Sequence, residues 1–239
     1  MPRISAGLLM YRIKDGATLF DVGLTLIVTT IGLFVQIGKG TLAPWSPTQR
    51  LVVVGRIWWI LRYWGLDDVR LLNGGWKGWT SADLPLETDK PEPPTPTKFA
   101  AIPKSKRLVA KQQVLDALKD RRLQIVDARS EKEFCGIDAM KNKRAEAIPG
   151  AKHLEWSDLL DQQTRRFKSP EQIRKLFEDA AIDLKKPTAT RCQSGGRASV
   201  MAFGMELMGA PDVGNYYAGW GEWGNAEDTP IVPGEAKKQ

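Results

Sequence analysis

Residues 190–199, "TRCQSGGRAS", place a cysteine directly before a polar turn that contains two glycines and an arginine. Apolar residues then recur at helical spacing, so Cys192 stands where a strand ends and a helix begins. The backbone N–H groups of such a loop, with the positive end of the helix, stabilise an anion. We therefore predict that Cys192 loses its proton readily and acts as a nucleophile. The alternative is that Cys192 is a buried packing cysteine. The polar residues that follow it argue against this alternative.

The residues that follow Cys192 indicate an anionic substrate. Glycine permits the left-handed backbone that turns N–H groups inward, and we expect that backbone at both Gly195 and Gly196. Arg197 adds a fixed positive charge and a two-pronged donor for an anion. Arg191 either adds to this positive field or points away from it. The predicted substrate-binding residues are Gln193, Ser194, Gly195, Gly196 and Arg197.

Other reactive side chains are few. The sequence contains two cysteines and one histidine, without the spacing of a disulfide framework or a zinc site, so we predict no metal and no cofactor. Cys135, in "EKEFCGID", has no activating neighbour and is interpreted as a packing thiol. His153, in "IPGAKHLEW", is interpreted as structural. A free reactive thiol favours a reduced, cytoplasmic setting.

The chain has 239 residues and a formal charge of +7. This positive excess is spread thinly, without basic runs interleaved with aromatic residues, so we predict no nucleic-acid partner. The apolar segment 22–38 has the minimum length for crossing a bilayer. It is either a membrane anchor, which would make the protein membrane-associated, or a buried core segment. Residues 87–98, rich in proline and charge, predict an extended linker.

An internal repeat lies on both sides of this linker. "GLDDVRLLNGGWKGW" (65–79) aligns without gaps with "GAPDVGNYYAGWGEW" (209–223). An apolar, helix-type segment precedes each copy, so the sequence predicts two copies of one helix–turn–strand unit. At the same offset, the position of Cys192 falls on Thr48, and the first copy therefore lacks the thiol.

Short apolar runs alternate with helical patterns after the linker. "LQIVDAR" (123–129) and "PTATRC" (187–192) predict strands, and Ser169 followed by Pro170 predicts the start of a helix. This alternation predicts an α/β domain with a largely parallel central sheet flanked by helices. Ligands bind at the carboxyl ends of the strands in such sheets, which is where Cys192 would lie.

Four segments, "VDARSEKEF", "AIPGAKHLEW", "CQSGGRAS" and "NYYAGWGEW", resemble in order and spacing the rhodanese domain of the thiosulfate sulfurtransferase family. The resemblance implies a catalytic rhodanese-like domain over residues 99–235. Residues 56–86 resemble the closing part of another rhodanese domain, which implies a partial second copy, the remnant of an inactive first domain. Residues 1–55 remain unassigned.

The resemblance also implies the chemistry. Cys192 would take a sulfur atom from thiosulfate, or a similar anionic donor, as a persulfide, and would pass it to a thiol or to cyanide. Asp127 and Arg129 match the strand-end Asp-x-Arg of the family and are expected to support the site. Trp220 and Trp223 either wall the pocket or pack the end of the domain. The alternative function is a non-catalytic persulfide carrier or interaction module.

The length and composition of the cysteine loop restrict the reactions that the site could catalyse. The six residues from Cys192 to Arg197 match sulfur-transferring members of this fold, whereas related phosphatases have a longer loop. "CQSGGR" departs from the Cys-Gly-[Ser/Thr]-Gly-Val-Thr loop of mercaptopyruvate sulfurtransferases, which makes mercaptopyruvate the less favoured donor. It also departs from the Cys-Arg-Lys-Gly-Val-Thr loop of the animal thiosulfate enzyme, so the identity of the donor stays open.

Overall fold

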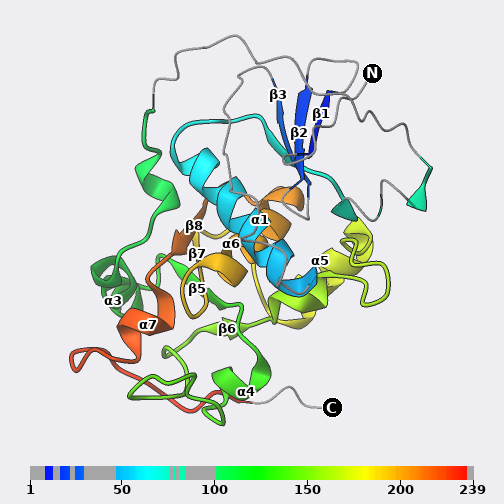
Figure 1. The fold of residues 1–239 in the computed structure, drawn as a ribbon. Helices are drawn as coiled ribbons and strands as arrows, with labels where there is room; N and C mark the ends of the chain where they lie inside the picture. Colours follow the sequence, from blue (N-terminus) through cyan, green and yellow to red (C-terminus); the bar gives the residue numbers. More distant parts are fainter. Residues whose placement is uncertain are drawn as a thin grey trace. The chain divides into compact units, whose positions relative to one another are not determined.

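The computed structural model describes residues 9–12, 17–21, 25–29, 47–75, 78, 81–83 and 101–235. The chain forms two compact units, each with its own four-stranded sheet (Figure 1). The first comprises Met1–Lys104 with Gln162–Arg166, and the second comprises Ser105–Asp161 with Phe167–Gln239. The predicted linker 87–98 lies outside the described residues.

The first unit contains an antiparallel sheet in the order β1-β2-β3-β4. Its elements are β1 (Leu9–Arg12), β2 (Ala17–Asp21), β3 (Thr25–Thr29), α1 (Pro47–Tyr63) and β4 (Val69–Leu71). Within the apolar segment 22–38, residues 25–29 form β3, and the rest of the segment is outside the described residues. No helix in the part of the chain that the structure describes is long and apolar enough to cross a membrane.

The two segments of the predicted repeat share several backbone features. Gly65 and Gly209 have left-handed φ angles of +97° and +90°, and Gly75 and Gly219 have φ angles of +54° and +58°. The strand pairing differs, because β4 pairs antiparallel with β3, whereas its counterpart in the second unit pairs in parallel. The matching glycine conformations agree with the proposal that 56–86 is an incomplete copy, whereas the strand pairing does not.

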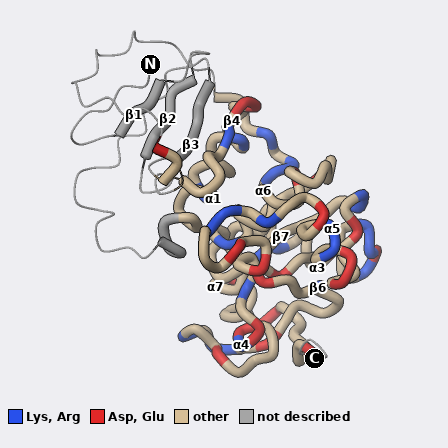
Figure 2. Tube along the Cα trace, turned by 90° about the vertical axis from the view of Figure 1, so that its right-hand side faces the viewer, with Lys and Arg blue, Asp and Glu red and all other residues tan. Residues whose placement is uncertain are grey.

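The second unit is an α/β domain with a parallel sheet in the order β6-β5-β7-β8, which confirms the predicted fold class. Its strands are β5 (Gln124–Asp127), β6 (Lys152–His153), β7 (Thr188–Arg191) and β8 (Val213–Tyr216). Its helices are α3 (Lys111–Asp120), α4 (Glu131–Phe134), α5 (Pro170–Asp179), α6 (Gly196–Leu207) and α7 (Gly219–Trp223), with short 3₁₀ turns at Ser105–Arg107 and Trp156–Leu159. Basic and acidic positions are interspersed along its trace (Figure 2).

Alternation along the strands separates the two faces of this sheet. Ile125, Ala189 and Tyr216 belong to one buried cluster with Val114 of α3 and with the two tryptophans of α7, and Figure 1 shows α3 and α7 on the same side of the sheet. On the other face, Nδ2 of Asn215 donates to the Gly195 carbonyl at the start of α6, at 3.0 Å.

Local sequence signals explain where the helices begin. The Ser169 hydroxyl accepts a hydrogen bond from the Gln172 N–H, and Gln172 Oε1 accepts one from the Ser169 N–H, at 3.3 and 3.0 Å. Pro170 is the first residue of α5, as predicted. The buried side chains of Ile173 and Phe177 then fix α5 against the core.

Gly219 lets α7 approach the loop that follows β7. A Cβ atom at Gly219 would lie 2.3 Å from the Cys192 carbonyl oxygen, whereas a Cβ at Gly150, also left-handed with φ of +73°, would meet no atom within 4 Å. We expect Gly150→Ala to lower the free energy of unfolding by about 1 kcal/mol and Gly219→Ala by about 3 kcal/mol. Urea unfolding followed by tryptophan fluorescence measures both losses, and equal losses would show that the close approach carries no energetic weight.

Candidate active site

Cys192 follows β7 directly and is 2% exposed. The loop after β7 is held by backbone hydrogen bonds from α7: the Trp220 N–H donates to the Cys192 carbonyl at 2.8 Å, and the Gly221 N–H donates to the Gln193 carbonyl at 2.9 Å. Gly195 caps α6 with a left-handed backbone, φ +78°. The cysteine is therefore fixed at the carboxyl end of a parallel strand, as predicted.

The turn leaves backbone donors available. Among the described residues, the N–H groups of Gln193, Gly195 and Gly196 donate to no protein acceptor outside the hydrogen bonds internal to helices and strands. The left-handed backbone expected at Gly195 is present, but the same expectation for Gly196 is wrong. Gly196 is already the first residue of α6 and takes a right-handed backbone. The turn and the start of α6 thus provide several amides without protein acceptors in consecutive residues, as an anion site requires.

The side chain of Gln193 is hydrogen-bonded to a loop that is distant in the sequence. Its amide exchanges two hydrogen bonds with the amide of Asn142, at 3.0 and 3.1 Å. Nδ2 of Asn225, after α7, donates to the same Asn142 oxygen at 2.9 Å. Ser194 is exposed. The hydrogen bonds between Gln193 and Asn142 join the cysteine loop to the segment that follows α4.

Arg197 already has an anionic partner within the protein. Its Nη1 and Nη2 donate to the two carboxylate oxygens of Glu133 at 2.5 and 2.8 Å. Glu133 also accepts from the Ser130 hydroxyl at 2.9 Å, which completes the cap of α4. The two-pronged donor that we predicted for a substrate anion is therefore occupied by a buried carboxylate.

The ion pair changes the acidity of both partners. Burial alone would raise the pKa of Glu133, but the hydrogen bonds and charge of Arg197, with those of Ser130, outweigh burial and lower it. Burial would lower the pKa of Arg197, but its hydrogen bonds to Glu133 and the charges of Cys192, Glu133 and Asp127 outweigh burial and raise it. Both groups are consequently charged across the physiological range.

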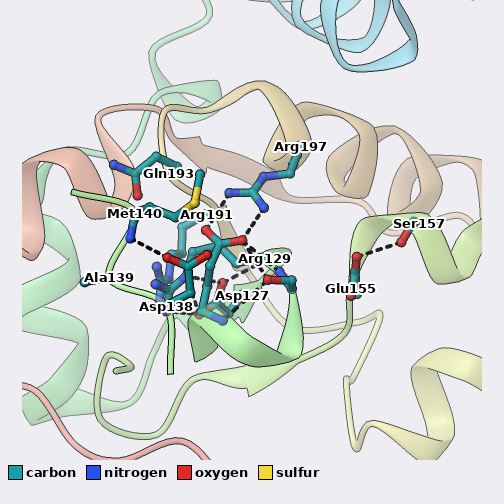
Figure 3. A network of polar contacts seen from close by, with 12 residues as sticks. Asp127, Arg129, Asp138, Ala139, Met140, Glu155, Ser157, Arg191, Gln193 and Arg197 are labelled. Atoms are coloured by element: carbon teal, nitrogen blue, oxygen red, sulfur yellow. Dashed lines mark hydrogen bonds and ion pairs between the residues drawn. The ribbon is translucent and has the colours of Figure 1, made fainter. Parts of the chain in front are cut away.

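A second, fully buried charge cluster lies at the ends of β5 and β7 (Figure 3). Asp127 and Arg191 are aligned in the parallel pairing of these strands, and Nη2 of Arg191 lies against Oδ2 of Asp127. Asp127 also accepts hydrogen bonds from the backbone N, Nε and Nη2 of Arg129 at 2.9–3.2 Å. Each of the three residues is at most 1% exposed. The structure thus brings the predicted supports, Asp127 and Arg129, to the strand that carries Cys192.

The cluster is stabilised by mutual charge and by one aromatic ring. The guanidinium carbons of Arg129 and Arg191 lie 4.5 and 4.7 Å from the centroid of the Trp220 ring. Burial would raise the pKa of Asp127, but the charges of Arg191 and Arg129 outweigh it and hold the pKa below its ordinary value. Burial lowers the pKa of Arg191 to about 9, against the opposing charge of Asp127. Arg191 therefore remains cationic near neutral pH.

The remaining candidates have structural surroundings. His153 Nε2 donates to the Arg129 carbonyl at 2.9 Å, and its ring stacks on Phe134 with centroids 4.5 Å apart. Burial, and then the charge of Glu131, raises the pKa of Cys135. Both effects disfavour a thiolate at this cysteine, in agreement with its interpretation as a packing thiol.

A hollow of about 480 Å³ lies at the opposite end of the sheet from Cys192. Its lining includes Leu123 and Gln124 at the start of β5 and Lys152 at the start of β6. These are amino ends of strands, whereas ligands of parallel sheets bind at carboxyl ends. The hollow is therefore separate from the cysteine site.

Sequence reasoning missed two residues of the site, Glu133 and Asn142. The Ser-x-x-Glu pattern of residues 130–133 signals a helix cap, and the structure shows that cap. The same pattern gives no sign that Glu133 also binds Arg197, which lies 64 residues away in the sequence. No local signal marks Asn142.

Comparison with known proteins agrees with this geometry. Residues 110–226 match the rhodanese-like domain family, and this part of the chain is a rhodanese-like domain. Human 3-mercaptopyruvate sulfurtransferase is 36% identical over 177 residues, which cover 73% of this chain and 59% of that protein. Mouse thiosulfate sulfurtransferase is 33% identical over 171 residues, covering 70% of this chain and 57% of that protein. The chain thus spans less than two thirds of these relatives.

Solved structures of EanB are also similar. The wild-type EanB structure has a TM-score of 0.69 and 28% identity, over 77% of this chain and 45% of that chain. An EanB variant in complex with ergothioneine covalently linked with a persulfide has the same TM-score and 29% identity, over 78% of this chain and 46% of that one.

The lowered pKa of Glu133 predicts how stability depends on pH. A carboxylate whose pKa is lower in the folded state contributes stability fully above its unfolded pKa, usually 4.5, and loses it as the pH falls through the folded pKa. We expect Glu133→Gln to reduce the free energy of unfolding at pH 7 and to flatten its decline below pH 4.5. Urea unfolding between neutral and acid pH measures the slope.

Glu178→Gln is the matched control, because Glu178 is exposed on α5. The free energy of unfolding of Glu178→Gln should change with pH in the same way as that of the unmodified protein. If the free energy of unfolding of Glu133→Gln also showed the pH dependence of the unmodified protein, the ion pair between Glu133 and Arg197 would contribute no pH-dependent stability.

Proposed function

We propose that the rhodanese-like domain is a sulfurtransferase that moves a sulfane sulfur from thiosulfate, or a similar anionic donor, to a thiol or cyanide through a persulfide on Cys192. The observation that carries the proposal is the cysteine at a strand end beside amides without protein acceptors. Two relatives named as sulfurtransferases, at 36% and 33% identity, support the same chemistry.

The reaction needs two displacements at sulfur. In the first, the Cys192 thiolate attacks the outer sulfur of thiosulfate, a new S–S bond forms, and the bond to the sulfonate sulfur breaks. Sulfite leaves with the bonding electron pair, and the cysteine becomes a persulfide anion. In the second, cyanide or a thiolate attacks the outer sulfur and regenerates the Cys192 thiolate. One negative charge therefore stays on the enzyme sulfur throughout.

Different residues and elements of the chain have different roles in this reaction. The amides of Gln193, Gly195 and Gly196 bind the charge on the transferred sulfur. The two-pronged face of Arg197 is occupied by Glu133, so Arg197 orients the oxygens of the donor only through its remaining N–H donors and carries no uncompensated charge. The hydrogen bonds from α7 keep the cysteine loop rigid, so the amides need no rearrangement during the transfer.

Replacing the nucleophile tests the proposal directly. We expect Cys192→Ser to lower cyanide-dependent thiocyanate formation from thiosulfate by at least about 10³-fold, because a serine hydroxyl at neutral pH cannot replace a thiolate. Cys135→Ser is the control and should retain the activity, since the pKa of Cys135 is raised by burial and by Glu131. Activity that depends on Cys135 instead would overturn the assignment of the nucleophile.

The donor is tested by comparing two substrates on the same protein. The "CQSGGR" loop departs from the loop of mercaptopyruvate sulfurtransferases, so we expect a higher kcat/KM with thiosulfate than with mercaptopyruvate. A higher kcat/KM with mercaptopyruvate would overturn the donor and leave the persulfide step intact.

The second candidate function is a non-catalytic persulfide carrier, and the 2% exposure of Cys192 bears on it because low exposure limits turnover with small donors in solution. In that case thiosulfate turnover would be negligible, and mass spectrometry of the purified protein would show one added sulfur atom on Cys192. Turnover that is lost in Cys192→Ser would exclude the carrier as the sole function.

A further inference from the structure

The backbone carbonyl of Gly195, in the cysteine loop, accepts hydrogen bonds from three donors. The Ser199 N–H donates to it at 2.9 Å, as the first bond of α6, and the Ser199 hydroxyl donates to it at 2.8 Å. The third donor, Nδ2 of Asn215 at 3.0 Å, comes from a different element, β8. Nδ2 also donates to the Ser199 hydroxyl at 3.0 Å, so Asn215 supports the Gly195 carbonyl both directly and through Ser199.

Asn215 is fully buried, and its polar atoms are only partly satisfied. Its Nδ2 makes two hydrogen bonds, whereas its Oδ1 has no hydrogen-bond partner among the described residues. A buried acceptor without a donor costs free energy, and an apolar side chain of the same size would avoid this cost. The stability of the core therefore gives little reason for an asparagine at this position. Its contact with the cysteine loop gives a better one.

The hydrogen bonds to the Gly195 carbonyl also fix the direction of the next amide. The carbonyl of Gly195 and the N–H of Gly196 belong to one planar, trans peptide group, so they point in opposite directions. Glycine by itself permits several orientations of this peptide. A Cβ at Gly195 would lie 2.5 Å from the ring of Tyr217, so no side chain can restrict the backbone there. The donors that hold the carbonyl therefore select the orientation.

We propose that Asn215 is a positioning residue of the sulfurtransferase site, which holds the Gly195 carbonyl and thereby keeps the Gly196 N–H available to the charge on the Cys192 sulfur. The inference rests on the proposed function, in which the Gly196 amide binds this charge. Outside the hydrogen bonds internal to helices and strands, the Gly196 N–H has no acceptor in the described part of the chain. Thiolate and persulfide each carry one negative charge, so Asn215 serves both states.

The pH midpoint of Cys192 alkylation tests this role. The test uses the Cys135→Ser protein, in which Cys192 is the only thiol, and follows the rate of alkylation by iodoacetamide against pH. Accessibility changes the rate at every pH and leaves the midpoint unchanged, whereas loss of an amide that binds the thiolate raises the midpoint. Asn215→Leu keeps the size of the side chain and removes both hydrogen bonds, and we expect it to raise the midpoint by about one pH unit. The ultraviolet absorbance that distinguishes a thiolate from a thiol gives the same midpoint if the reagent does not reach the sulfur.

Thr190→Val is the matched control. Thr190 is paired with Asn215 in the register of β7 and β8 and is equally buried. Its hydroxyl donates to the Gly214 carbonyl at 3.2 Å, and not to the cysteine loop. We expect Thr190→Val to reduce the free energy of unfolding and to leave the midpoint unchanged. A midpoint that is unchanged in Asn215→Leu, or that rises equally in Thr190→Val, would overturn the proposal.

Ser199→Ala provides a second variant. It removes one of the three donors, keeps that of Asn215 and introduces a residue that favours α6, so we expect a smaller rise of the midpoint. None of the three replacements changes a charge, and the charges of Arg191 and Arg197, which act on the cysteine, are retained. If Asn215→Leu does not fold, Ser199→Ala decides, and a midpoint equal to that of Thr190→Val would then overturn the proposal.

Failure of the positioning role and failure of the proposed function are distinguishable. A midpoint raised by Asn215→Leu, in a protein that forms no thiocyanate from thiosulfate even with Asn215 present, supports the positioning role and overturns the reaction with a small donor. Thiocyanate formation by a protein whose midpoint does not respond to Asn215→Leu overturns the positioning role alone.

Discussion

The contact between Asp127 and Arg191 depends on the parallel pairing of β5 with β7, and much of the site depends on that contact. Charges removed from water are tolerated only when they are closely matched. Asp127 meets this condition for Arg129 through several hydrogen bonds and for Arg191 through direct contact. Removing the carboxylate would leave two unmatched cations in the core, directly beneath the cysteine loop.

Around this cluster, rigidity comes from backbone contacts. The amides of α7 bind the carbonyls of Cys192 and Gln193, and Gly219 allows the close approach that these bonds require. The two hydrogen bonds between the side-chain amides of Gln193 and Asn142 fix the side chain of Gln193 as well. A loop held in this way presents its free N–H groups in one arrangement, which is the condition for electrostatic stabilisation without reorganisation.

The two groups of buried charges differ in net charge. The pair of Arg197 with Glu133 gives the rim of the site a directional donor that carries little net charge. The cluster beneath the loop has an excess of one positive charge in a dry environment, where its field is weakly screened.

Local patterns in the sequence determined the α/β class, the position of Cys192 at a strand end, the start of α5 at Ser169 and Pro170, and the left-handed Gly195, because each depends on neighbouring residues alone. Tertiary structure decided the rest. Gly196 belongs to α6 rather than to the turn, Arg197 is bound by Glu133, and Arg191 turns toward Asp127 rather than away. These outcomes join residues far apart in the chain, and strand register and helix packing set such distances, which no local pattern encodes.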